Sequence, residues 1–183
     1  METNSALTIV IPKSFHDKIN TIRSEYDNAY PRWMPHINLH FPFVATTEFP
    51  KIKEILETKL KGYGPFEVEL DVIGFFKQKN GYTFHLKPKK PEKLKALFKF
   101  VSDALPEAKS KHAVFNPHMT LGQVDALAIP DSRGKNKKDE MEKLLNTEFA
   151  NGIKFTLDRI CLLERSKIDN KIPFTINSEI MLV

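Results

Sequence analysis

The chain alternates between short stretches with the two-residue period of a strand and longer stretches with the spacing of a helix. Runs rich in β-branched and aromatic residues predict strands over residues 7–11, 35–43, 66–76, 82–87, 114–124, 153–163 and 173–183. Apolar residues three or four positions apart predict helices within residues 14–26, 47–62, 91–105 and 139–149. Ser14 is expected to cap the first helix, and Asn80-Gly81 to form a hairpin turn with positive φ angles. The pattern therefore predicts an α+β fold.

The order of these elements occurs twice along the chain. Strand, helix, strand, helix and long strand follow one another in residues 6–76 and again in residues 82–183, where a further strand closes the chain. Residues 68–73, which contain Asp71, can be aligned with residues 155–160, which contain Asp158. The repeat predicts one domain over residues 1–183, built of two similar lobes related by pseudo-symmetry. We expect structural roles for both aspartates.

One short motif is present in both halves. It reads Pro35-His36-Ile37-Asn38-Leu39 in the first half and Pro117-His118-Met119-Thr120-Leu121 in the second. Because side chains alternate between the faces of a strand, His36 and Asn38 are expected on one face, as are His118 and Thr120. If the two strands face each other across a groove, two imidazoles and two hydrogen-bond donors meet there.

These residue types suit the cleavage of a phosphate ester without a metal ion. One imidazole takes the proton of the attacking water or hydroxyl and the other protonates the leaving oxygen, because the ordinary histidine pKa of about 6.5 lies near neutral pH. The amide of Asn38 and the hydroxyl of Thr120 can donate to the phosphoryl oxygens. The motif predicts His36 and His118 as catalytic residues and Asn38 and Thr120 as phosphate ligands, with neither metal nor cofactor.

Other residues near the motifs allow more than one interpretation. Arg32 and Trp33 precede the first motif and could hold a phosphate and stack on a base, or Trp33 could cover the end of the core. His40 follows His36 by four residues, but on a strand the two lie about 13 Å apart, so a zinc site is not expected. Three histidines belong to no pattern and are interpreted as incidental: His16, His85 and His112.

Composition adds weaker limits. The formal net charge of +5 and a sequence pI of about 9.2 are compatible with an anionic partner such as a nucleotide or RNA. Part of the excess lies in the basic cluster of residues 133–138, which could contact an RNA backbone or remain solvated. No stretch approaches the about 18 apolar residues of a membrane span, and residues 6–11 are too short for a signal sequence. With Cys161 as the single cysteine, no internal disulfide can form, so we expect a protein of the cytosol or nucleus, without a membrane partner and monomeric.

The paired motif resembles the signature of the two-histidine (2H) phosphoesterase superfamily, the LigT-like or 2′-5′ RNA ligase-like proteins. That signature is two His-x-Thr/Ser-x tetrapeptides, one in each lobe. The copy that begins at His118 matches fully, whereas the copy that begins at His36 has Asn38 in place of Thr or Ser. The resemblance implies a two-lobed LigT-like fold, in which antiparallel sheets face a central groove and helices lie outside.

The resemblance also implies an activity. Members carry out metal-independent hydrolysis or transesterification of RNA-derived esters, such as 2′,3′-cyclic phosphates and 2′-5′ linkages. Applied to this chain, it implies a phosphodiesterase that uses His36 and His118 as acid and base, in either order. Two alternatives stay open: a non-catalytic module of the same fold that binds a nucleotide or an RNA end, and an unrelated α+β interaction domain whose histidines coincide by chance.

Overall fold

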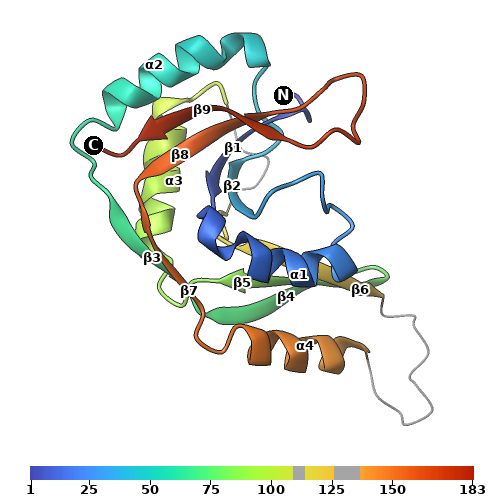
Figure 1. Cartoon of the computed structure of the whole chain (residues 1–183). Coiled ribbons are helices and arrows are strands. Elements are labelled where there is room, and N and C mark those ends of the chain that lie inside the picture. Colours follow the sequence, from blue (N-terminus) through green and yellow to red (C-terminus); the bar gives the residue numbers. More distant parts are fainter. Residues whose placement is uncertain (109–113, 126–136) are drawn as a thin grey trace.

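The computed structural model describes residues 1–108, 114–125 and 137–183, and in these ranges antiparallel strands form two sheets and a ribbon (Figure 1). The four-stranded sheet has the order β2 (His36–His40), β1 (Ser5–Val10), β8 (Arg159–Glu164), β9 (Thr175–Met181). The three-stranded sheet has the order β4 (Val72–Gln78), β5 (Gly81–Lys87), β6 (Met119–Asp125). The ribbon pairs β3 (Phe66–Leu70) with β7 (Ile153–Leu157).

Helices flank the sheets, and they are α1 (His16–Tyr26), α2 (Phe49–Lys59), α3 (Glu92–Ala104) and α4 (Lys137–Glu148). Helix α2 lies along β9 at one end of the molecule, and α4 lies against β4 and β6 at the other (Figure 1). Apolar residues at helical spacing explain this packing: α3, for example, buries Leu94, Leu97 and Val101. None of the helices in the described ranges is long and apolar enough to cross a membrane.

The two halves of the sequence exchange strands between the two sheets. The order β2-β1-β8 in one sheet matches β6-β5-β4 in the other, so each sheet takes its third strand from the opposite half. The predictions of single long strands over residues 66–76 and 153–163 are therefore wrong. Each strand is interrupted, at Asp71 and at Asp158, where the chain passes from the ribbon into a sheet. Asp71 accepts a hydrogen bond from the backbone N–H of Lys89 at 2.8 Å, and Asp158 accepts two from Arg159. Both aspartates thus stabilise the interruptions between consecutive strands.

Two local predictions also differ from the structure. Ser14 makes no capping hydrogen bond, because a short 3₁₀ turn at Lys13–Phe15 precedes α1 and moves its start to His16. The turn between β4 and β5 forms where Asn80-Gly81 predicts it, but neither residue has a positive φ. Gly81 has a different function, since a Cβ there would collide with the backbone carbonyl oxygen of Val124 on β6.

Helix α1 lies directly on β6, and a glycine makes this approach possible. A Cβ on Gly122 would lie 2.5 Å from the Cβ of Tyr26, so any larger residue would push the helix away. The contact encloses an ion pair in which the Arg23 guanidinium donates to the Asp27 carboxylate at 2.8 Å, with side chains 2% and 1% exposed. Gln123 of β6 also donates to this carboxylate, and the pair therefore joins the first half of the chain to the second.

Candidate active site

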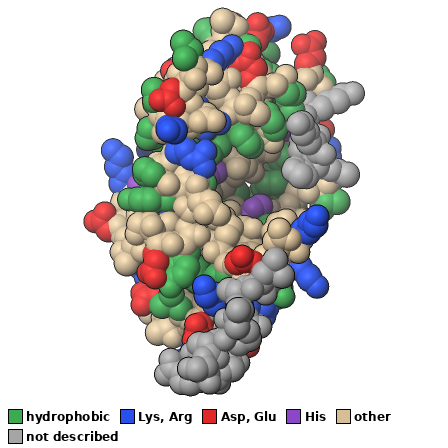
Figure 2. Space-filling view, turned by 90° about the vertical axis from the view of Figure 1, so that its right-hand side faces the viewer, with side chains coloured by type: hydrophobic (Ala, Val, Ile, Leu, Met, Phe, Trp, Pro, Cys, Tyr) green, Lys and Arg blue, Asp and Glu red, His purple; other side chains and the backbone are tan. Residues whose placement is uncertain are grey.

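The two strands that carry the motifs contact each other between the sheets. His36 is the first residue of β2, and His118 immediately precedes β6. Asn38 of the first motif and His118 of the second line one cavity of about 410 Å³, together with Phe41, Phe76 and Phe98. We call it the site cavity. Figure 2 shows a hollow near the middle of one face, with histidine and apolar side chains in its wall.

The backbone holds the two motif histidines in the same way. Nδ1 of His36 lies 2.7 Å from the carbonyl oxygen of Met34, and Nδ1 of His118 lies 2.7 Å from that of Asn116. A carbonyl oxygen can only accept, so each Nδ1 carries a proton. Nε2 is therefore the nitrogen that gains or loses the second proton in both rings.

His36 is neutral over the physiological pH range. Its pKa is lowered to about 4, chiefly by burial and also by the charges of Arg23 and His118, which together outweigh the opposing effects of the Met34 carbonyl and Asp27. A neutral imidazole with a protonated Nδ1 has a basic Nε2. This side chain is accordingly suited to accept a proton.

The two polar residues of the motifs differ in their surroundings. Asn38 lines the site cavity, and its buried Oδ1 has no hydrogen-bond partner in the described part of the chain. Thr120 is half-buried on β6 and lies opposite His85 of β5. Both residues stand two positions beyond their histidine on a strand, so each side chain points to the same side as its histidine.

Trp33 belongs to the apolar packing behind His36. Its ring stacks on the His36 imidazole with centroids 4.5 Å apart and contacts the ring of Phe174 at 3.8 Å. Of the two interpretations of Trp33, this packing supports the one in which its ring covers the end of the apolar core. Arg32 donates to the carbonyl oxygen of Asn28 at 2.9 Å, and its contact with a substrate stays a prediction.

His40 lies apart from the motif histidines. It is 1% exposed, its Nε2 is 3.1 Å from the Ser102 hydroxyl, and its ring stacks on Phe98. Within residues 1–108, 114–125 and 137–183, no three histidine, cysteine, aspartate or glutamate side chains are placed to hold a metal ion. His112 and residues 133–136 of the basic cluster lie outside the described residues.

The sequence analysis missed His85. This residue lies in the middle of β5, is 3% exposed, and its ring centroid is 5.2 Å from that of His118. The His85 ring also stacks on Phe76, with centroids 4.3 Å apart, and Phe76 in turn contacts the ring of His118 at 4.9 Å. The only signal in the sequence was the alternation of apolar residues along β5. That alternation does not show that the strand pairs with β6 and brings His85 near His118.

Acid is expected to destabilise the protein through three histidines whose pKa is lowered in the folded state. The pKa values of His36, His40 and His85 all fall from 6.5 to about 4, chiefly through burial, so unfolding takes up protons below pH 6.5. The contribution of these three neutral histidines to the free energy of unfolding is fully present above pH 6.5 and is lost as the pH falls toward 4. At about 1.4 kcal/mol per pKa unit, the 1% exposed His40 contributes on the order of 2–3 kcal/mol over this range.

Thermal unfolding followed by circular dichroism at pH 7 and pH 4.5 measures this effect. We expect Tm to fall between the two values, and the fall to be smaller in a His40→Leu variant, which has lost one of the three groups. An equal fall in the variant and the wild type would contradict the assignment to His40.

Comparison with known proteins places this geometry in a family. The sequence model of the 2′-5′ RNA ligase superfamily matches residues 11–169. The chain belongs to this superfamily. It is 32% identical over 121 residues to a Staphylococcus haemolyticus protein named "Putative phosphoesterase", covering 66% of this chain and 70% of the relative. A Staphylococcus aureus protein of the same name is 27% identical over 118 residues, covering 64% of this chain and 69% of the relative.

The superfamily's fold is also found in solved structures. E. coli LigT in complex with 3′-AMP superimposes with a TM-score of 0.65 at 16% identity, covering 99% of this chain and 98% of LigT. The LigT-like α+β fold predicted from the paired motif is thereby confirmed. The curated relatives named above are bacterial and give no support to a nuclear location, whereas a cytosolic location stays a prediction.

Proposed function

We propose that the protein is a metal-independent phosphodiesterase that acts on an RNA-derived or nucleotide phosphoester, either a 2′,3′-cyclic phosphate or a 2′-5′ linkage. One observation carries the proposal. Two histidines from matching strands are held alike through Nδ1, and both motifs contribute to one cavity. Such an arrangement provides one proton acceptor and one proton donor to a phosphate bound between them.

The pKa of His36 favours its role as the base. In hydrolysis of a 2′,3′-cyclic phosphate, Nε2 of His36 takes a proton from water as the water oxygen bonds to phosphorus. The bond from phosphorus to one ribose oxygen breaks, and the imidazolium of His118 donates its Nε2 proton to that oxygen. The product is a phosphate monoester, and the proton passes back from His36 to His118 through solvent.

The polar motif residues and the aromatic wall of the cavity fit a nucleotide. The amide of Asn38 and the hydroxyl of Thr120 are proposed to donate to the phosphoryl oxygens, where charge is highest during the reaction. Phe41, Phe76 and Phe98 give the cavity an aromatic wall on which a base can stack. The structural neighbour LigT has been solved with 3′-AMP, ATP, NADP⁺ and phosphate, which supports a nucleotide as ligand.

A substrate screen in the presence of EDTA tests the proposal. The purified protein is incubated with 2′,3′-cyclic nucleotides and with matched 2′-5′ and 3′-5′ linked oligonucleotides, and products are separated by chromatography. We expect cleavage of at least one of the first two substrate classes, unaffected by EDTA. Binding of 3′-AMP without turnover of any substrate would instead favour the non-catalytic binding module, for which Asn38 in place of Thr or Ser is the motivating feature.

A further inference from the structure

In each sheet the strand that carries a histidine motif pairs with a central strand, β1 in one sheet and β5 in the other. The side chains of these two central strands next to the motifs differ in chemistry. On β1, Val10 lies opposite His36. On β5, which matches β1, His85 lies opposite Thr120, and Lys87 follows two residues later on the same face. The apolar Val10 beside the first motif thus corresponds to the cationic Lys87 beside the second.

The face beside His36 is filled. Val10 belongs to a small apolar cluster that covers this side of the four-stranded sheet, and the other members are Ala6, Trp33, Met34, Phe41, Cys161, Leu163 and Phe174. Because these side chains pack against one another, the sheet surface on this side is covered. The Arg165 guanidinium lies over the ring of Phe174, 4.7 Å from its centroid, so the positive charge on this side belongs to a side chain packed on the cluster.

The face beside His118 is open and cationic. A cavity of about 530 Å³ lies there, lined by His85, His118, Lys87, Lys89 and Lys95, and no carboxylate among the described residues lines it. We call it the lysine pocket. Phe76, Asn116 and His118 line both the lysine pocket and the site cavity, so the two cavities are adjacent.

The floor of the lysine pocket contains a fixed polar group. His85 is 3% exposed, and its buried Nδ1 has no hydrogen-bond partner in the described ranges. Gly74 on β4 makes room for the ring, because a Cβ there would lie 2.7 Å from Nε2 of His85 and 3.3 Å from Cε of Lys87. The glycine therefore permits both side chains to lie at this end of the pocket.

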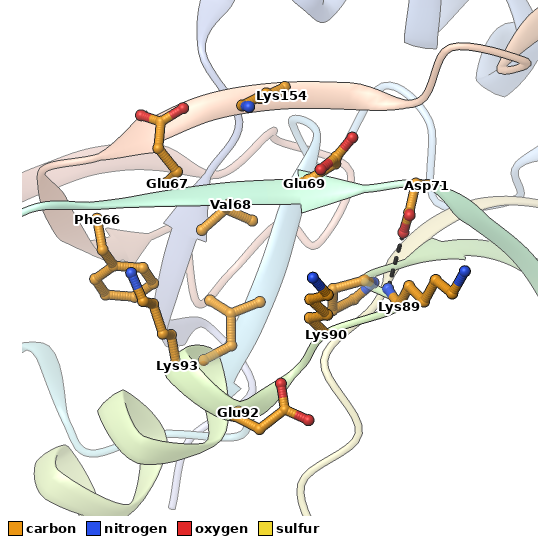
Figure 3. Close-up of a pocket in the computed structure, with 12 residues that line it drawn as sticks. Phe66, Glu67, Val68, Glu69, Asp71, Lys89, Lys90, Glu92, Lys93 and Lys154 are labelled. Atoms are coloured by element: carbon orange, nitrogen blue, oxygen red, sulfur yellow. Dashed lines mark hydrogen bonds between the residues drawn. The ribbon is translucent and has the colours of Figure 1, made fainter.

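A third cavity of the described chain has a different charge pattern. It measures about 620 Å³ and is lined by four lysines and four carboxylates, and Figure 3 shows residues such as Lys90 and Lys93 on one side and Glu67 and Glu69 on another. Opposite charges offset one another in this wall. Lysines near a cavity are therefore common on this protein, but a cavity wall with lysines and no carboxylate is found beside His118.

We propose that the lysine pocket binds a second phosphate group of the substrate, carried on the part of the molecule that extends past His118. The substrate class is then a nucleotide with a phosphate besides the reacting one, such as a 5′-phosphorylated nucleotide or an oligonucleotide. Lys87 and Lys95 supply the positive charge, and His85 supplies a polar group at the base of the pocket. This inference rests on the proposed function, because it extends the same site.

The test compares the binding of 3′-AMP and adenosine 3′,5′-bisphosphate, which differ by one phosphate, by isothermal titration calorimetry at low salt. We expect the bisphosphate to bind the wild type about tenfold more tightly, as is typical of added charge-assisted hydrogen bonds. In a Lys87→Ala/Lys95→Ala double variant the ratio of the two affinities should approach one.

Lys93→Ala is the matched control. Lys93 is on α3 like Lys95, but its Nζ lies over the ring of Phe66, 5.7 Å from the centroid, and it lines the mixed-charge cavity of Figure 3. This variant should keep the wild-type ratio. Equal affinities in the wild type, or a ratio that Lys93→Ala reduces as much as the double variant does, would overturn the inference. Since binding is measured without turnover, the result is independent of whether the protein cleaves any substrate.

Discussion

Replacing His36 or His118 with alanine is expected to lower kcat for a 2′,3′-cyclic nucleotide by about 10²–10⁴-fold. The reason is that in the proposed mechanism each imidazole transfers a different proton, one at the attacking water and one at the leaving oxygen. The double variant should be little worse than either single variant, because residues that act as a unit have non-additive effects. Steady-state kinetics with a chromatographic assay measures all three.

His16→Ala provides a control for the loss of an imidazole. His16 is the first residue of α1, its Nε2 is 2.8 Å from the carbonyl oxygen of Ile11, and it lines neither the site cavity nor the lysine pocket. This variant should retain wild-type kcat, and circular dichroism should show that all variants are folded. Full turnover by the His118→Ala variant would rule out the two-histidine mechanism.

The largest effect on stability is expected from Asp27→Ala. The substitution leaves the guanidinium of Arg23 with its charge buried and unpaired, and removal of one partner of a buried pair costs about 3–5 kcal/mol. Asp27 also accepts hydrogen bonds from the backbone N–H of Ala29 and from Gln123, and these are lost as well. Urea denaturation measures the change in the free energy of unfolding.

Asp103→Ala is the matched comparison for this variant. It removes the same carboxylate from another i,i+4 pair, in which Lys99 and Asp103 are 77% and 64% exposed, and such pairs contribute about 1 kcal/mol or less. An Arg23→Met/Asp27→Leu double variant should recover much of the loss, because no buried charge is left. If Asp27→Ala cost no more than Asp103→Ala, the expected penalty for leaving the buried Arg23 guanidinium unpaired would be contradicted.

The element order and the paired motif could be predicted because both are local. Pro-His-x-polar-Leu occurs twice in the sequence, and two-residue alternation places its polar members on one face. The breaks at Asp71 and Asp158 could not be predicted, because one polar residue in an apolar run also occurs in continuous strands. Where each half-strand pairs depends on contacts far away in the sequence, which a hydrophobic pattern does not contain.

His85 and Trp33 show the same limit at the candidate site. His85 acquires its place only through the register of β5 against β6, which sets it opposite Thr120 and near His118. Trp33 lies three residues before His36, and its sequence context allowed both base stacking and covering the core; it packs in the apolar cluster against Phe174, which comes from the far end of the chain. For both residues, the surroundings depend on a segment distant in the sequence.

The exchanged strands have a consequence for how the two sides of the active site could diverge. Two separate copies of one half, each lending its last strand to the other, would form a swapped homodimer with the same residues on both sides. In this protein the turn between β4 and β5 joins the two halves in one chain. Each position of a half then occurs twice in the sequence, and the two copies can hold different residues. A single chain can therefore have Asn38 on one side and Thr120 on the other, and Val10 where its counterpart is Lys87, so a substrate without twofold symmetry can be held in one orientation.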